Sequence, residues 1–271
     1  MSRRTVNLRN SYDLANLFHY NTKISPARMR ILSRRTFRLK VNRKMIEGMK
    51  TYKLSPKESL IDKSFPLVLK ERMTTRIYEI RTPILFDIVS TLLHFSYGVS
   101  RFQDNYNYRF IASAGGIYPI EIYLVAFNVR GIEKGIYIYD EISNSIKLVK
   151  VGDFRRQFHE SVSGMNKYYV DNCAFIIVST INISSTCEKY DNRGYRFINI
   201  DVGHLSQNLY LVSSALSLGV VAIGGFIDEQ LEQLLNLHDV EDGVALFHCF
   251  GKKQQAPIDA LKLKLEDYYE K

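Results

Sequence analysis

The stretch RFIASAGGIYPIEIYLV, residues 109–125, combines a turn of small residues with an apolar run and is the most informative segment for the fold. Its second half continues into EIYLVAFN, and this apolar run ahead of Gly131 predicts a strand over 121–128. Its first half is a turn of small residues: Ser113, Ala114, Gly115 and Gly116. Such a turn lets the backbone approach a flat ligand and offers N–H groups to an anion or a ring oxygen. A structural glycine turn is the plainer explanation, since the spacing of a dinucleotide-binding GxGxxG is absent.

Further strands follow this stretch. GIYIYD (135–140) and NSIKLVKV (144–151) come after tight connections, which predicts an antiparallel meander of three strands. CAFIIVSTI (173–181) is a continuous β-branched run, typical of a strand covered on both faces. The spacing of apolar residues predicts helices over 83–97 and 195–218. Strands interleaved with helices predict an α+β fold whose central sheet is mixed, mostly antiparallel and flanked by helices.

Composition narrows the class of protein. The chain has 271 residues, of which 46% are hydrophobic, and this is enough to bury a substantial core. No run approaches the roughly 20 apolar residues that a membrane span requires, and the basic N-terminus does not resemble a signal peptide. The three cysteines are too few and too scattered for a disulfide framework or a zinc site. We therefore expect a cytoplasmic protein with no metal site and no membrane partner.

The positive charge is concentrated near the N-terminus. The net charge is +9, whereas residues 1–50 alone carry 13 basic and two acidic side chains. A basic arm of this kind contacts nucleic acid, an acidic peptide or a phosphate, or it forms a solvated helical face. The sequence holds no DNA- or RNA-binding motif, so we predict no nucleic-acid partner. We divide the chain into a basic, mostly helical N-terminal extension, residues 1–66, and a second domain, residues 67–271.

A second motif contains two arginines that flank a hydroxyl, in ERMTTRIYE at residues 71–79. Arg72 and Arg76 lie four positions apart on either side of Thr74, and guanidinium groups with a hydroxyl suit a phosphate. A surface helix with solvated charges explains the same pattern equally well.

Taken in order, these motifs resemble the nitroreductase superfamily of flavoenzymes and, within it, the SagB-type dehydrogenases. ERMTTR is similar to an RRSxR-like segment, with Met73 in place of a basic residue and Thr74 in place of serine. ASAGGIYPIE is similar to PSAGALYPIE, with Ala112 in place of proline. The motifs KYDNRGYR (189–196), GH (203–204), QN (207–208) and GGF (224–226) then follow in the order found in SagB-type enzymes. The likeness spans about residues 70–253.

The resemblance implies a nitroreductase-like FMN-binding fold and a role for each matching position. The FMN phosphate and ribityl chain would be held by Arg72, Thr74, Arg76 and Lys252. The isoalloxazine ring would lie along Ser113, Ala114, Gly115 and Gly116. Backbone N–H groups near the flavin N5 and O4 would come from Gly224 and Gly225.

Lys189 and Tyr190 match a Lys-Tyr dyad that marks SagB-type dehydrogenases, and we assign them the catalytic proton chemistry. Oxidation of a thiazoline or oxazoline removes a hydride and a proton from adjacent carbons, so a base must accept the proton. An ordinary lysine or tyrosine is a poor base at neutral pH, and we expect a partly buried Lys189 beside Arg193 to have a lowered pKa. Without the surrounding motifs, an ordinary polar loop explains both residues.

The predicted function is FMN-dependent oxidation of peptidyl thiazolines and oxazolines to thiazoles and oxazoles in microcin-type biosynthesis. The implied partners are an azoline-containing precursor peptide, a cyclodehydratase complex and a second copy of the chain in a homodimer. Two alternatives remain open: a generic NAD(P)H-dependent flavin oxidoreductase, and a flavin-poor scaffold subunit of the cyclodehydratase complex. His204 is interpreted as a core or interface histidine, and no neighbour of Cys187 favours a nucleophilic role.

Overall fold

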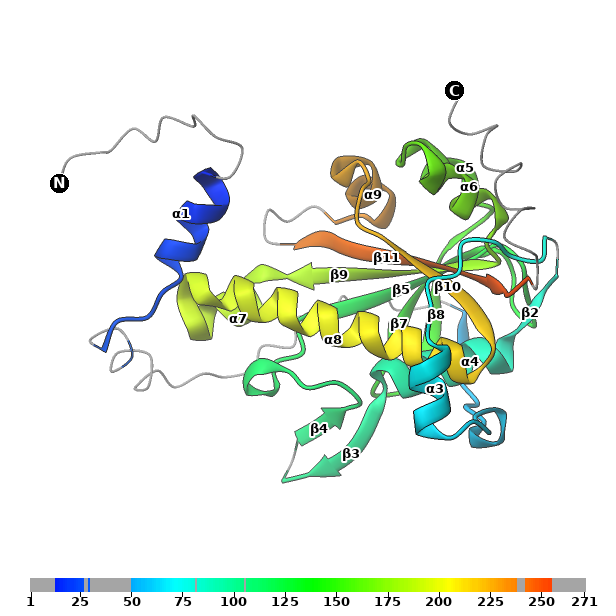
Figure 1. The fold of residues 1–271 in the computed structure, drawn as a ribbon, viewed down its shortest axis with the longest axis horizontal. Helices are drawn as coiled ribbons and strands as arrows, with labels where there is room; N and C mark the ends of the chain where they lie inside the picture. Colours follow the sequence, from blue (N-terminus) through cyan, green and yellow to red (C-terminus); the bar gives the residue numbers. More distant parts are fainter. Residues whose placement is uncertain are drawn as a thin grey trace.

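The computed structural model describes residues 13–26, 29, 50–80, 82–104, 106–237 and 242–254. At its centre seven antiparallel strands form one sheet in the order β1-β8-β7-β5-β9-β11-β10 (Figure 1). These strands are β1 (Thr51–Lys53), β5 (Ile120–Ala126), β7 (Gly135–Asp140), β8 (Ser145–Val151), β9 (Phe175–Asn182), β10 (Leu218–Ile223) and β11 (Asp242–Lys252). The predicted antiparallel meander is confirmed as β5, β7 and β8.

Two small sheets lie outside the central one. The strands β2 (Ile84–Leu85) and β6 (Val129–Arg130) pair in parallel, and β3 (Val99–Gln103) and β4 (Tyr106–Arg109) form an antiparallel hairpin. The parallel pairing that makes the architecture mixed is therefore confined to two-residue strands. The predicted α+β class is confirmed, with a large sheet flanked by helices. The central sheet, expected to be mixed and mostly antiparallel, is antiparallel throughout, since the parallel pair of β2 and β6 lies outside it.

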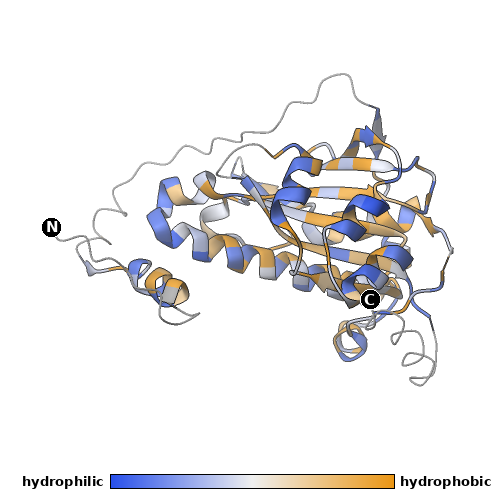
Figure 2. Ribbon diagram, turned by 90° about the horizontal axis from the view of Figure 1, so that it is seen from above, coloured by the Kyte–Doolittle hydropathy of each residue, from blue (hydrophilic) through white to orange (hydrophobic). Residues whose placement is uncertain are grey.

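Helices cover both faces of the central sheet (Figure 1). On one face lie α4 (Phe86–Tyr97) and α8 (Gly194–Ala215), whose apolar residues share a core with β5 and β9. The opposite face is covered by α5 (Arg155–Glu160), α6 (Met165–Asn172) and α9 (Asp228–Leu235). When the ribbon is coloured by hydropathy, the central strands are largely apolar, whereas each helix also carries hydrophilic residues (Figure 2). The result is a three-layered arrangement.

Strand β5 shows how the sequence produces these layers. Successive side chains of a strand point to opposite faces. Ile122 and Leu124 accordingly pack in the core under α4 and α8, whereas Tyr123 and Val125 pack in the core under α5, α6 and α9. Strand β9 is buried from Phe175 to Ile181, which confirms that it is covered on both faces.

Several local expectations are refined by the structure. The helix expected over 83–97 begins at Phe86, because Ile84 and Leu85 instead pair with β6. The segment 51–67 supplies β1, the 3₁₀ turn η1 (Glu58–Leu60) and the start of α3 (Phe65–Glu71). The division of the chain between residues 66 and 67 stays a prediction.

The described N-terminal part is the helix α1 (Asp13–Asn21), which contacts the first turn of α8 through Arg196, a donor to the carbonyl of His19 at 2.8 Å. Most of the basic arm lies outside the described residues, as does Ser11, which the pattern SYDLANLFHY (11–20) suggests as a helix cap. Within the described ranges, none of the helices is both long enough and apolar enough to cross a membrane.

Candidate functional site

The 113–116 turn is held in place by α8. The Ser113 hydroxyl donates to the buried carboxylate of Asp201 at 2.5 Å and accepts the Tyr118 N–H at 2.9 Å. One turn further along α8, His204 Nδ1 lies 3.0 Å from the carbonyl oxygen of Ala112. Burial raises the pKa of the Asp201 carboxyl group. Because the Ser113 hydroxyl bonds to Asp201 and Tyr118, its role is to fix the conformation of the turn.

The backbone favours glycine at position 115, and any β-carbon there would displace the dyad. Gly115 has φ of +65°, and a β-carbon there would lie 2.5 Å from Lys189 Nζ and 2.6 Å from the Tyr190 hydroxyl. Gly116 has a similar φ of +66°, but a β-carbon there would meet nothing within 4 Å. The structure therefore brings the predicted dyad directly onto the predicted turn, with open space beside it.

The dyad ends a helix rather than lying in a loop. Lys189 and Tyr190 form the last turn of α7 (Ile183–Tyr190), which Asn182 caps by accepting the Ser185 N–H at 2.9 Å. The half-buried Lys189 ammonium lies 5.3 Å from the centre of the Tyr190 ring. The Tyr190 ring in turn meets the Phe197 ring edge-on at 4.9 Å. The ring contact with Phe197 orients the Tyr190 side chain, and the helix end places Lys189 beside it.

The arginine segment lies along the outer edge of β10. Thr75 N–H donates to the carbonyl of Val220 at 2.8 Å, which places Arg72, Thr74 and Arg76 beside this strand. The Arg72 guanidinium lies 5.7 Å from the Tyr210 ring, and the Thr74 hydroxyl is 3.4 Å from the Tyr210 hydroxyl. Arg72 and Arg76 are exposed, and neither has a carboxylate partner among the described residues.

Lys252, at the end of β11, meets the same segment. Its ammonium pairs with Glu79 at 2.9 Å, and the Glu79 N–H donates to its carbonyl at 2.9 Å. The neighbouring residues Tyr78 and Gly251 are also in contact. The buried Tyr78 ring packs on Gly251, where a β-carbon would lie 2.6 Å from Tyr78 Cγ. Glycine at 251 therefore lets the arginine segment pack closely against the sheet, and the burial that results raises the pKa of Tyr78.

Gly224 and Gly225 follow the last residue of β10 and are exposed. A β-carbon would meet Leu246 at 3.6 Å from position 224 and Asn166 at 3.9 Å from position 225, which are ordinary contacts. Packing does not demand glycine at either position. The two glycines therefore leave their backbone accessible just after the end of β10. Thr75 contacts the same strand nearer its start, at Val220.

The predicted residues thus form two groups. The turn group consists of Ser113, Ala114, Gly115, Gly116, Lys189 and Tyr190, and the strand-edge group consists of Arg72, Thr74, Arg76, Gly224, Gly225 and Lys252. Asp201 contacts the first group and Tyr210 the second. These two residues are nine positions apart on α8, which at about 100° per residue places them on opposite faces of the helix. Within one chain, α8 separates the two groups.

Sequence reasoning missed the residues of α8 that hold both groups, Asp201 and Tyr210. A carboxylate at position 201 interrupts the apolar stripe formed by Ile198, Val202 and Leu205, and this interruption is a readable signal. Tyr210 carries no such signal, since a half-buried tyrosine is ordinary in a helix of this kind.

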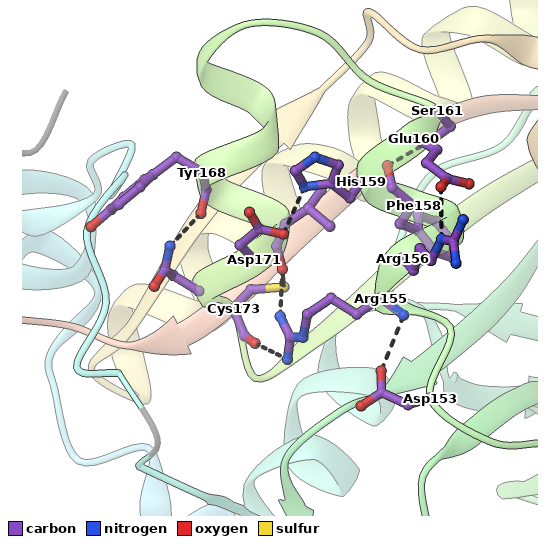
Figure 3. A network of polar contacts seen from close by, with 12 residues as sticks. Asp153, Arg155, Arg156, Phe158, His159, Glu160, Ser161, Tyr168, Asp171 and Cys173 are labelled. Carbon is purple, nitrogen blue, oxygen red and sulfur yellow. Dashed lines mark hydrogen bonds and ion pairs between the residues drawn. The ribbon is translucent and has the colours of Figure 1, made fainter. Parts of the chain in front are cut away.

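A separate polar cluster lies where α5 and α6 meet (Figure 3). Arg155 donates to the carbonyls of Val170 and Cys173, and His159 Nδ1 lies 2.8 Å from Asp171. Several of these residues line a cavity of about 530 Å³. The Arg155 guanidinium is used to join α5 to the end of α6, so the cluster explains how these helices are fixed, and it includes neither group defined above.

Comparison with known proteins gives one family. The model of the nitroreductase family matches residues 69–252. Among curated relatives, a Methanocaldococcus jannaschii protein named as a nitroreductase, MJ1384, is 30% identical over 64% of this chain and 84% of its own. The microcin B17-processing protein McbC of Escherichia coli is 28% identical over 51% of this chain and 52% of its own.

Solved structures agree in fold. A nitroreductase-type protein from Anabaena variabilis has a TM-score of 0.70 at 26% identity, over 89% of this chain and 47% of that one. A chain of the E. coli microcin synthetase McbBCD complex, solved with truncated pro-MccB17, has a TM-score of 0.61 at 18% identity, over 89% and 92%. A nitroreductase-type protein from Exiguobacterium sibiricum in complex with FMN has a TM-score of 0.50 at 13% identity, over 73% and 96%.

Proposed function

The chain belongs to the nitroreductase family, and from this membership we propose that it is an FMN-dependent dehydrogenase that oxidises azoline rings in peptides. The observation that carries the proposal is the position of Lys189 and Tyr190, whose polar atoms converge on Gly115 beside the open space at Gly116. Nitroreductases are oxidoreductases, and a lysine–tyrosine pair at the redox site adds the means to move a proton.

The residues of the strand-edge group fit a bound FMN. Arg72 and Arg76 are exposed cations next to the Thr74 hydroxyl, a set of donors suited to a phosphate. At the other end of β10, exposed backbone at Gly224 and Gly225 suits a polar ring edge. FMN would supply a two-electron acceptor when bound. The FMN complex of the E. sibiricum relative supports this choice of cofactor.

The turn group would carry the proton transfer. Conversion of an azoline to an azole removes one hydrogen as hydride, with two electrons, and the other as a proton from the adjacent carbon. Lys189 in its neutral form accepts that proton, and the neighbouring Tyr190 hydroxyl shares it. The contact of Tyr190 with Phe197 keeps the phenol directed toward the turn. Molecular oxygen is the expected final electron acceptor.

Two of the comparisons favour a peptide substrate. McbC is a microcin-processing protein, and the McbBCD complex was solved with a truncated microcin precursor. By this likeness we propose a precursor peptide as substrate and a cyclodehydratase as partner. The match covers about half of McbC, so both assignments belong to the proposal and not to the family membership.

We propose that the flavin site is completed by a second copy of the chain. Since α8 separates the two groups in one chain, a homodimer packed across the outer face of α8 would place the turn group of one copy near the strand-edge group of the other. This face carries Ile200, which is 51% exposed, and Gly203, where a β-carbon would meet nothing within 4 Å. A glycine inside a helix costs about 1 kcal/mol relative to alanine, and no contact within the described chain explains it.

The substitution Gly203→Leu tests this arrangement. In the monomer position 203 is exposed, an added β-carbon meets nothing within 4 Å, and leucine favours the helix, so the melting temperature of the monomer should not fall. In the dimer it should block close approach and shift sedimentation toward the monomer. Glu229→Leu adds the same side chain on the exposed face of α9 and should leave the dimer unchanged. A Gly203→Leu variant that stays dimeric argues against packing at this face.

The absorption spectrum of the purified protein tests the function first. Bound FMN gives a yellow protein, and turnover of an azoline peptide should then remove two hydrogens per ring by mass spectrometry. The likeness to MJ1384 favours one alternative, a generic NAD(P)H-dependent flavin oxidoreductase. Rapid flavin reduction by a nicotinamide, with no loss in Lys189 variants, would establish that alternative. A colourless protein that does not rebind FMN would instead be a scaffold subunit.

A further inference from the structure

Strand β10 is the last strand of the sheet, and its outer edge is covered by single contacts instead of another strand. On this edge the Val220 carbonyl accepts the Thr75 N–H at 2.8 Å. Two residues further along, the Ala222 N–H donates to the Tyr210 hydroxyl at 3.0 Å. Side-chain and loop groups therefore take the place of a partner strand, which an edge requires if it is not to pair with another chain.

Tyr210 contacts β10 and two residues of the strand-edge group. Its hydroxyl accepts from Ala222 on β10 and lies 3.4 Å from the hydroxyl of Thr74, and its ring lies 5.7 Å from the Arg72 guanidinium. Beneath it the fully buried His248 faces the same ring at 6.0 Å. Tyr210 thus rests on the sheet and contacts the arginine segment with its exposed side.

Alternate residues of a strand direct their N–H groups to the same edge. Within β10, Val220 and Ala222 therefore face the same outer edge. Gly224 comes directly after the last residue of the strand, so a group that fixes the Ala222 N–H anchors the backbone that leads into Gly224. One hydroxyl therefore couples the arginine end of β10 to its glycine end.

We propose that Tyr210 is a positioning residue for the cofactor, which holds the phosphate-binding segment and the Gly224-Gly225 backbone at a fixed separation. This inference rests on the proposed FMN-dependent function. Tyr210 acts through Thr74 and Ala222. It sets the spacing between the arginine segment and the Gly224-Gly225 backbone, and loss of its hydroxyl removes the acceptor of the Ala222 N–H.

The test is FMN binding to the apo-protein, followed by flavin fluorescence. Tyr210→Phe keeps the ring against Arg72 and His248 and removes only the hydroxyl, and it should raise the Kd for FMN about fivefold. Tyr137→Phe is the matched control, because that hydroxyl also makes one backbone bond, to the carbonyl of Glu133 at 2.7 Å, but on β7. The control should bind FMN as the wild type does.

A second route starts from Thr74, the residue through which Tyr210 contacts the arginine segment. Thr74→Val should weaken FMN binding, Thr74→Ser should restore it, and Thr74→Val combined with Tyr210→Phe should cost less than the two changes added together. Hydrogen exchange at the Ala222 amide should be faster in Tyr210→Phe than in the wild type, with or without FMN.

The outcomes separate the two proposals. Equal FMN affinity and equal Ala222 exchange in Tyr210→Phe and wild type overturn the role of Tyr210 and leave the proposed function standing. A wild-type protein that binds no FMN overturns both.

Discussion

The turn group and the strand-edge group flank the same helix but are built in opposite ways. In the turn group contacts within the protein fix the geometry, because Ser113 bonds to Asp201 and to Tyr118, and the Tyr190 ring packs against Phe197. In the strand-edge group Arg72 and Arg76 point to solvent without a carboxylate partner among the described residues. A preorganised half suits chemistry, which requires fixed geometry, and an open cationic half suits capture of an anion.

Among the substitutions that test this difference between the two groups, Lys189→Ala should have the largest effect. Lys189→Ala removes the proposed base, and general-base catalysis contributes roughly 10² to 10⁴ in rate, so kcat for azole formation should fall at least about a hundredfold. FMN affinity should stay within about twofold, because the change lies in the turn group. Lys147→Ala, which breaks the ion pair with Asp140 on β7 and β8, is the control for loss of a lysine. Retained turnover in Lys189→Ala contradicts the assignment.

On the strand-edge side of α8, the buried His248 of β11 should make stability depend on pH. Burial lowers the pKa of His248 to about 3, whereas a histidine in an unfolded chain titrates near 6.5. Below about pH 6.5 the unfolded chain therefore binds a proton that the folded protein does not, and stability falls as pH falls. The loss reaches about 1.4 kcal/mol per pH unit and ends near the folded pKa.

His248→Gln should remove this dependence. Between pH 6.5 and pH 5 the wild type should lose about 2 kcal/mol more of its free energy of unfolding than the variant, as measured by urea unfolding. Parallel curves for wild type and His248→Gln would show that the buried imidazole is not the cause.

The third effect tests the open half. Arg76→Ala removes a charged hydrogen-bond donor and should raise the Kd for FMN about tenfold, with a smaller dependence on salt than the wild type has. Arg156→Ala removes an exposed arginine on α5 whose partner is Glu160 at 2.8 Å, and it should leave FMN binding unchanged. Equal effects of the two substitutions would mean that net charge, and not the arginine segment, governs binding.

The elements of the fold that could be predicted from the sequence are those whose signal lies within one element. The β-branched run at 173–181 and the apolar stripe of α8 depend on periodicity within one element, and both are found as predicted. The hairpin of β3 (VSRFQ) and β4 (YNYR) was missed, because both strands are short and bury no clear apolar face. The helix α7 was missed because ISSTCEKY contains serine and threonine, which favour caps and turns over helix interiors.

The site divides in the same way. The spacing of the motifs identified residues that the structure gathers, since the polar atoms of Lys189 and Tyr190 lie over Gly115, more than 70 positions earlier in the chain. It gave no indication that α8 lies between the two groups, because that depends on which face of a helix each loop meets. Contacts such as Asp201 with Ser113 and Tyr210 with Thr74 join segments far apart in sequence, and no local pattern encodes them.

The smallest expected effect is the difference between Gly115→Ala and Gly116→Ala, which separates displacement of the dyad from backbone strain. Gly115 and Gly116 have nearly the same φ, so alanine at either position carries the same left-handed penalty, about 1–2 kcal/mol. Only at position 115 does the added β-carbon collide with Lys189 Nζ and the Tyr190 hydroxyl. Both are the ends of flexible side chains and can move aside, so the two variants should differ little in melting temperature. Because the dyad is displaced in one variant alone, kcat for azole formation should be several-fold lower in Gly115→Ala than in Gly116→Ala. Equal kcat values would mean that the turn presents the ligand without depending on where the dyad lies.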